Sequence, residues 1–113
     1  MIYHITTERG WQIAREMGEY RAQSLKTEGF IHCSTREQVP KIADAFYRDM
    51  PNLVVLGIDS DKLTASLRWE APAHPDGDSL PMVEESETFP HVYGPIDLDS
   101  VVSVVPLSEF LDR

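Results

Sequence analysis

Short runs of apolar residues, some continuous and some alternating with polar residues, recur along this chain and predict several strands. Residues 53–59 are almost continuously apolar, which predicts a strand buried on both faces near the centre of a sheet. Residues 67–70 alternate and predict a half-buried strand with Arg68 and Glu70 on one face. The pattern also predicts a strand at 2–5, another at 28–33, a short extended segment at 89–95 and a last strand at 101–105.

A first helix is predicted directly after the first strand. Thr6 or Thr7 can cap its amino-terminal end, Glu8 suits its first turn, and Gly18 would stop it after about Met17. Its expected apolar stripe consists of Trp11, Ala14 and Met17, with Ile13 beside them.

A second helix is predicted to begin between Ser34 and Pro40 and to end near Met50. Ser34 and Glu37 have the spacing of a capping box, and Pro40 fits the first turn of a helix. The residues expected on the buried side of this helix are Val39, Ile42, Ala43, Phe46 and Tyr47. Residues 71–80, rich in proline, glycine and aspartate, predict an exposed loop.

Two early helices and several later strands predict the α+β class, and 113 residues without a repeat or linker predict a single domain over 1–113. The net charge of −9 disfavours binding to nucleic acid, because the phosphate backbone is bound through clustered cations. The apolar runs are too short to cross a bilayer, and no signal-peptide pattern is present, so we expect a cytoplasmic protein with no membrane partner.

Three histidines in predicted strands are the strongest candidates for a site. Because side chains alternate along a strand, His4 shares a face with Ile2, and His91 shares one with Tyr93. His32 shares a face with Phe30 and Ser34 by the same rule. One such histidine is usually a structural residue, but three on separate strands of a small chain favour a common, semi-buried pocket. His74, in the proline-rich loop, is expected to be merely exposed.

Other chemistries receive less support from the pattern. Cys33 faces away from His32 on the same strand, so we expect a buried, unreactive thiol instead of a nucleophile. Zinc held by the three histidines is chemically feasible, but none of the usual ligand spacings is present. Arg68 could hold an anionic group while Glu70 orients or activates another. The carboxylates of Glu84, Glu85 and Glu87 are expected to form a solvated run.

Four ordered motifs resemble the bacterial family called domain of unknown function 952. They are Ile2-Tyr-His-Ile-Thr6, Glu28-Gly-Phe-Ile-His-Cys-Ser34 followed by Gln38-Val39, Leu67-Arg-Trp-Glu70 and Phe89-Pro-His-Val-Tyr-Gly-Pro95. That family is thought to be distantly related to the ADP-ribosyltransferase superfamily, whose fold is a split, bent β-sheet with flanking helices. The resemblance implies a pocket for NAD or ADP-ribose. It would place His4 at the adenosine ribose, His32 or Ser34 near the nicotinamide, and His91 with Tyr93 completing the pocket.

The leading hypothesis is therefore a domain that binds a nucleotide-like ligand, with NAD as a candidate substrate and ADP-ribosyl transfer as the candidate reaction. The expected catalytic residues are His32, His91 and Glu70, the last as candidate for the superfamily's glutamate. The expected ligand-binding residues are His4, Thr6, Ser34, Arg68 and Tyr93, and no bound metal is expected. The alternatives are a non-catalytic ligand-sensing or interaction module and a metal-dependent enzyme that uses the three histidines.

Overall fold

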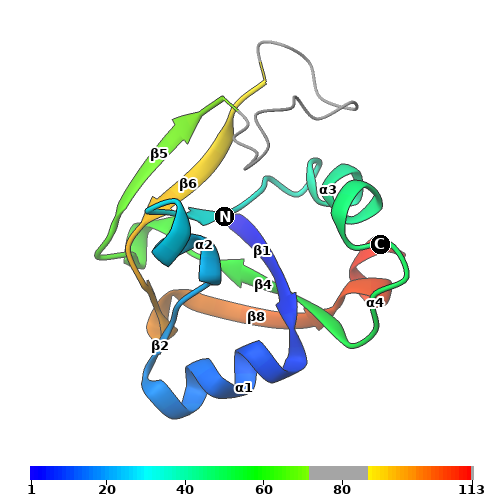
Figure 1. Ribbon diagram of the computed structural model, residues 1–113, viewed down its shortest axis with the longest axis horizontal. Coiled ribbons are helices and arrows are strands. Elements are labelled where there is room, and N and C mark those ends of the chain that lie inside the picture. The colour runs from blue at the N-terminus through cyan, green and yellow to red at the C-terminus, as the bar shows by residue number, and fades with distance from the viewer. Residues whose placement is uncertain (72–86, 113) are drawn as a thin grey trace.

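The computed structural model describes residues 1–71 and 87–112, and Figure 1 shows how their helices and strands are arranged. The predictions for His74, Glu84, Glu85 and the part of the 71–80 loop after Ala71 lie outside the described residues. Glu87, predicted as part of a solvated run, is instead 17% exposed, accepts from Gln38 Nε2 and pairs with Lys41. The strands are β1 (Ile2–Thr7), β2 (Glu19–Tyr20), β3 (Ile31–His32), β4 (Leu53–Ile58), β5 (Ser66–Glu70), β6 (Phe89–Tyr93), β7 (Ile96–Asp97) and β8 (Val101–Pro106). The α-helices are α1 (Glu8–Met17), α2 (Gln23–Thr27), α3 (Val39–Phe46) and α4 (Leu107–Leu111), and short 3-10 turns span Ser60–Lys62 and Leu98–Ser100.

One sheet has the antiparallel order β1-β4-β8, with β4 in the middle. Every residue of β4 is buried, which confirms the prediction of a central strand. Leu53 and Val55 face a core that α3 and α4 cover, and these two helices lie side by side in Figure 1. Val54, Leu56 and Ile58 face the opposite way, into a second core. The sheet is therefore covered on both faces.

A second antiparallel sheet has the order β3-β6-β5 and closes that second core. On the face toward the core, Val92 of β6 lies between Ile31 of β3 and Leu67 of β5. On the outward face, His91 of β6 lies between His32 of β3 and Arg68 of β5. A single antiparallel bridge between Tyr3 and Ser34 joins this sheet to β1. Strands β2 and β7 form a separate two-stranded ladder. Within the described residues the architecture is of the predicted α+β class, and its strands form several small antiparallel sheets.

Helix α1 follows its predicted bounds because both ends are specified locally. The Thr7 side chain accepts a 2.9 Å hydrogen bond from the Gly10 amide, and Gly18 ends the helix with φ +87°, where a side chain would be strained. The predicted apolar stripe is only partly correct. Ala14 is buried and Trp11 packs against the core, but Met17 is 64% exposed, at the last residue before the chain turns away at Gly18.

The start of α3 corrects the predicted capping pair by one residue. The Thr35 amide donates to Gln38 Oε1 (2.9 Å) and the Gln38 amide to Thr35 Oγ1 (3.2 Å), so Thr35 and Gln38 form the reciprocal pair. Ser34 is instead held by its bridge to β1. The helix also ends at Phe46, earlier than predicted, and the next turn includes a left-handed residue at Asp49.

The side chains expected to cover the core from α3 do so with one exception. Phe46 is 41% exposed, whereas the other members of the predicted set are buried or pack against the core: Val39, Ile42, Ala43 and Tyr47. Strand β2, helix α2, strand β7 and helix α4 were not predicted, because two residues of a strand or five residues of a helix are too few to show its period. None of the helices in the described part of the chain has the length and hydropathy needed to span a membrane.

Cys33 is buried in the core between the two sheets, as expected, and burial raises the pKa of its thiol. We expect a water-soluble thiol reagent at neutral pH to label it in the folded protein at least about 10²-fold more slowly than in the unfolded chain. Labelling requires the thiolate and an opening of the core, and both are disfavoured in the folded state. The measurement is the labelling rate with and without denaturant, and equal rates would contradict a buried thiol.

Candidate functional site

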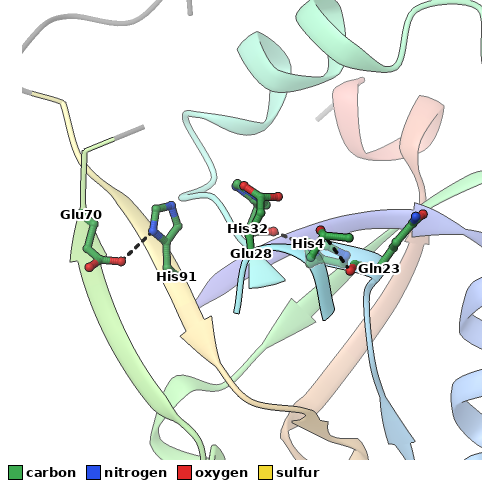
Figure 2. A network of polar contacts seen from close by, with 7 residues as sticks. His4, Gln23, Glu28, His32, Glu70 and His91 are labelled. Atoms are coloured by element: carbon green, nitrogen blue, oxygen red, sulfur yellow. Dashed lines mark hydrogen bonds and ion pairs between the residues drawn. The ribbon is translucent and has the colours of Figure 1, made fainter. Parts of the chain in front are cut away.

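The outward face of the sheet β3-β6-β5 carries most of the predicted site. Its opposite face is occupied by the core, so alternation along each strand directs the polar set away from that core. Figure 2 shows His91 and Glu70 on neighbouring strands, with His32 and Glu28 beside them. The side chains that this face gathers are Phe30, His32, Arg68, Glu70, His91 and Tyr93, with Glu28 at its border.

Glu70 is fixed by two donors that meet at one of its oxygens. Oε1 accepts a hydrogen bond from His91 Nδ1 (2.9 Å) and another from the Tyr93 hydroxyl (2.5 Å). The bond from Tyr93, and then the bond from His91, lower the pKa of the Glu70 carboxyl. No hydrogen bond from a residue in the described ranges reaches Oε2, and the side chain is 36% exposed. The result is an ionised carboxylate with a fixed orientation and one open oxygen.

His91 is the buried element of this face. Its side chain is 2% exposed, and the Phe30 ring stacks on it with centroids 4.2 Å apart and planes at 22°. Burial is the main cause that lowers its pKa, so the ring is neutral at pH 7. Because Nδ1 donates to Glu70, the lone pair of the neutral ring is on Nε2. His91 is thus more deeply buried than the semi-buried residue predicted from the sequence.

His32 is the accessible histidine and has a carboxylate of its own. Its Nε2 lies 3.0 Å from Glu28 Oε2, and its side chain is 37% exposed. The strand predicted at 28–33 is too long: only Ile31–His32 is a strand, since Glu28 ends α2 and Gly29 turns the chain with φ +90°. The His32 and His91 ring centroids are 5.5 Å apart, nearly edge to face. The two histidines therefore form one cluster.

Arg68 supplies the positive charge of this face. Its guanidinium carbon lies 4.9 Å from the centre of the Tyr93 ring, within the range of a cation–π contact. Its charge also contributes to lowering the pKa of Glu70. A guanidinium and a carboxylate on adjacent positions of one strand face could contact opposite ends of a polar ligand.

His4 belongs to a different, interior network. Its Nδ1 donates to the backbone carbonyl of His32 (2.6 Å), and its Nε2 lies 2.8 Å from the Tyr20 hydroxyl. The same hydroxyl lies 3.0 Å from Thr6 Oγ1. Both ring nitrogens of His4 are therefore engaged inside the protein, and burial lowers its pKa to about 4. His4 and Thr6 therefore help to hold β3, the strand that carries His32, in place from the interior of the protein.

Three residues with clear roles in these networks were missing from the predicted set. Tyr20 lies in a two-residue strand that the sequence pattern does not reveal. Glu28 and Phe30 lie four and two residues before His32, and Phe30 was placed on the correct face without a role. Ser34, predicted as a ligand contact, is buried, and its backbone forms the bridge to β1. Among the described residues, no three side chains of the metal-binding types converge on a point that could hold an ion.

The buried His4 predicts a specific loss of stability in acid. Its pKa is about 4 in the folded protein and about 6.5 when exposed, so between these values the unfolded chain binds more protons. The contribution of neutral His4 is complete above pH 6.5 and is lost as the pH falls toward 4, by up to roughly 3 kcal/mol. Urea unfolding at several pH values should show this slope in the wild type. The slope should be smaller in His4→Gln, and an equal slope in both would contradict the assignment.

The fold and site define a small α+β protein with a histidine- and carboxylate-bearing sheet face. The family described as "Protein of unknown function (DUF952)" matches residues 5–104, and the chain belongs to that family. A crystal structure of protein CC0527 from Caulobacter crescentus is similar, with 28% identity, a TM-score of 0.76, and coverage of 99% of this chain and 98% of that one. The solution structure of CC0527 matches with 29% identity and a TM-score of 0.70, over 93% of this chain and 82% of that one. No functionally curated protein matches the chain.

Proposed function

We propose that the outward face of β3-β6-β5 binds a nucleotide-like ligand, with NAD as the candidate, and transfers its ADP-ribose unit. The observation that carries the proposal is the Glu70 carboxylate, which is fixed at Oε1 by His91 and Tyr93 and whose Oε2 receives no hydrogen bond from the part of the chain that the structure describes. Departure of nicotinamide from NAD leaves positive charge on the ribose carbon. A carboxylate that is already ionised and oriented stabilises that charge without reorganising during the reaction.

The other groups of this face fit the remainder of such a ligand. Arg68 is exposed and can pair with a phosphate oxygen of such a ligand. His91, buried beneath Phe30, acts by holding Glu70. His4, which the family resemblance would place at the ligand, and Thr6, also expected as a ligand contact, are better assigned to holding β3 in place. Both nitrogens of His4 are used internally, and the Thr6 hydroxyl lies against Tyr20.

The fold is also compatible with a distant ADP-ribosyltransferase relationship. Two three-stranded antiparallel sheets face each other across one core, and the Tyr3–Ser34 bridge and the His4–His32 hydrogen bond link them. Such a pair resembles a bent sheet that has split along its length. The bridge lies next to His32, so the split would place the proposed site at the junction of the two halves.

A thermal-shift screen against NAD, ADP-ribose, other nucleotides and divalent cations tests the proposal directly. A ligand specific for the folded state and present at a hundredfold excess over its dissociation constant adds about 2.7 kcal/mol of stability. We expect NAD or ADP-ribose to raise Tm by several degrees, and Arg68→Ala to reduce that shift. No shift with any nucleotide, or an undiminished shift in Arg68→Ala together with Glu70→Ala, would contradict binding at this face.

A further inference from the structure

We propose that Glu28 and His32 form a second functional unit of this site, which deprotonates the acceptor of the transferred group. The inference rests on the proposed function, and it adds the chemical class of the acceptor: a hydroxyl group, of water or of an alcohol. His32 would be the catalytic residue in contact with the acceptor, and Glu28 the positioning residue that holds the imidazole.

The geometry of the pair is that of an oriented base. Glu28 Oε2 lies 3.0 Å from His32 Nε2, so a proton on Nε2 leaves the lone pair of the neutral ring on Nδ1. No residue in the described ranges forms a hydrogen bond with that Nδ1. Phe30 packs against the same ring, with centroids 4.8 Å apart, and restricts its rotation. With 37% of its side chain exposed, His32 can meet a solute, whereas His91 cannot.

The carboxylates of Glu28 and Glu70 lie on different strands, which suits two different roles in the reaction. Glu28 and His32 lie at β3, and Glu70 lies at β5, with β6 between them. Two strand spacings put the backbones of β3 and β5 about 10 Å apart. Between them lie Phe30 and His91, both buried. For the reaction, a ribose carbon beside Glu70 and a nucleophile beside His32 would have to meet over these two rings, at the roughly 3 to 3.5 Å at which they react.

Transfer of ADP-ribose from NAD to a hydroxyl group needs no reactant other than NAD, the acceptor and the His32 base. The acceptor oxygen forms a bond to the ribose carbon, the carbon–nitrogen bond to nicotinamide breaks, and its electron pair leaves with neutral nicotinamide. The hydroxyl proton passes to His32 Nδ1, and the resulting imidazolium is stabilised by the Glu28 carboxylate. A hydroxyl needs this base because it loses a proton as it attacks. A neutral amine can attack first and lose its proton afterwards, so it depends less on His32.

The test uses the full chain with NAD and follows both binding and chemistry. Calorimetry gives the NAD affinity, and mass spectrometry gives nicotinamide, ADP-ribose, and the products formed with added methanol or methylamine. We expect wild type to give ADP-ribose and the O-methyl product. Glu28→Gln and His32→Asn should keep the NAD affinity within about threefold and lose these products by roughly 10²-fold. Glu16→Gln, an exposed change on α1, is the matched control and should behave as wild type.

Four further results decide the inference. Added imidazole should restore part of the rate in His32→Ala, and Glu28→Asp should retain more activity than Glu28→Gln, neither of which a purely structural role predicts. If wild type releases nicotinamide and both substituted chains do so at the same rate, the Glu28–His32 assignment is wrong while the proposed function stands. If wild type does not bind NAD in the calorimeter, the proposed function fails, and the acceptor assignment fails with it.

Discussion

Replacement of His4 by alanine is expected to remove about 3 kcal/mol from the free energy of unfolding at pH 7. The imidazole bonds the His32 carbonyl on one side and the Tyr20 hydroxyl on the other, so its loss leaves both groups without that partner in the interior. Each unsatisfied buried polar group costs roughly 1 to 3 kcal/mol, and the vacated volume adds to this cost. Urea unfolding of wild type and His4→Ala at pH 7 measures the difference.

His32→Ala is the control for that experiment. Its side chain is partly exposed and pairs with a surface-accessible carboxylate, so its loss should cost less than about 1 kcal/mol. A His4→Ala protein as stable as His32→Ala would mean that water or local rearrangement satisfies Tyr20 and the His32 carbonyl. In that case the hydrogen bonds of His4 would not be what holds β3 in place.

Glu70→Gln is expected to lower the rate of nicotinamide release from NAD by roughly 10²- to 10³-fold, with a much smaller change in NAD affinity. The substitution keeps the shape of the side chain but removes the charge that would stabilise the cationic ribose carbon. Affinity and rate are measured separately, by calorimetry and by chromatography of released nicotinamide. Glu16→Gln again serves as the control, since it removes one carboxylate from an exposed position of α1.

The same experiment separates an enzyme from a binding module. A wild-type protein that binds NAD and releases no nicotinamide, with Glu70→Gln binding equally well, would identify a ligand sensor instead of a transferase. A wild-type protein that releases nicotinamide, with Glu70→Gln as fast, would falsify the role proposed for this carboxylate. Tyr93→Phe refines the result, because loss of one of the two donors to Oε1 should raise the pKa of Glu70 and move the acidic limb of the rate profile to higher pH.

Much of the candidate site was predictable from the sequence because strand alternation is a local rule. The rule placed Arg68 with Glu70, His91 with Tyr93, and His32 with Phe30, and all three pairs share the outward face of one sheet. It also directed Cys33 into the core, where its thiol is buried. These predictions hold because a two-residue period depends only on backbone geometry.

The role of His4 could not be predicted in the same way. Alternation correctly placed it on the face of Ile2, which packs into the core between the sheets. Nothing in the local pattern indicates that Tyr20, sixteen residues later, would occupy its second nitrogen. A histidine on a buried face is available to a ligand only if no distant side chain of the fold forms a hydrogen bond with its ring nitrogens.

By itself, the sequence determined the elements whose signals are short-range. Thr7 and Gly18 set the ends of α1, and the continuous apolar run of β4 set the centre of a sheet. Tertiary structure alone decided how the chain paired its strands, with β6 between β3 and β5, so that Glu70 met His91 and Tyr93. It also moved the cap of α3 to Thr35, because Ser34 was bound to β1. The physical reason is that caps and periods act over a few residues, whereas pairing partners are chosen by burial across the whole chain.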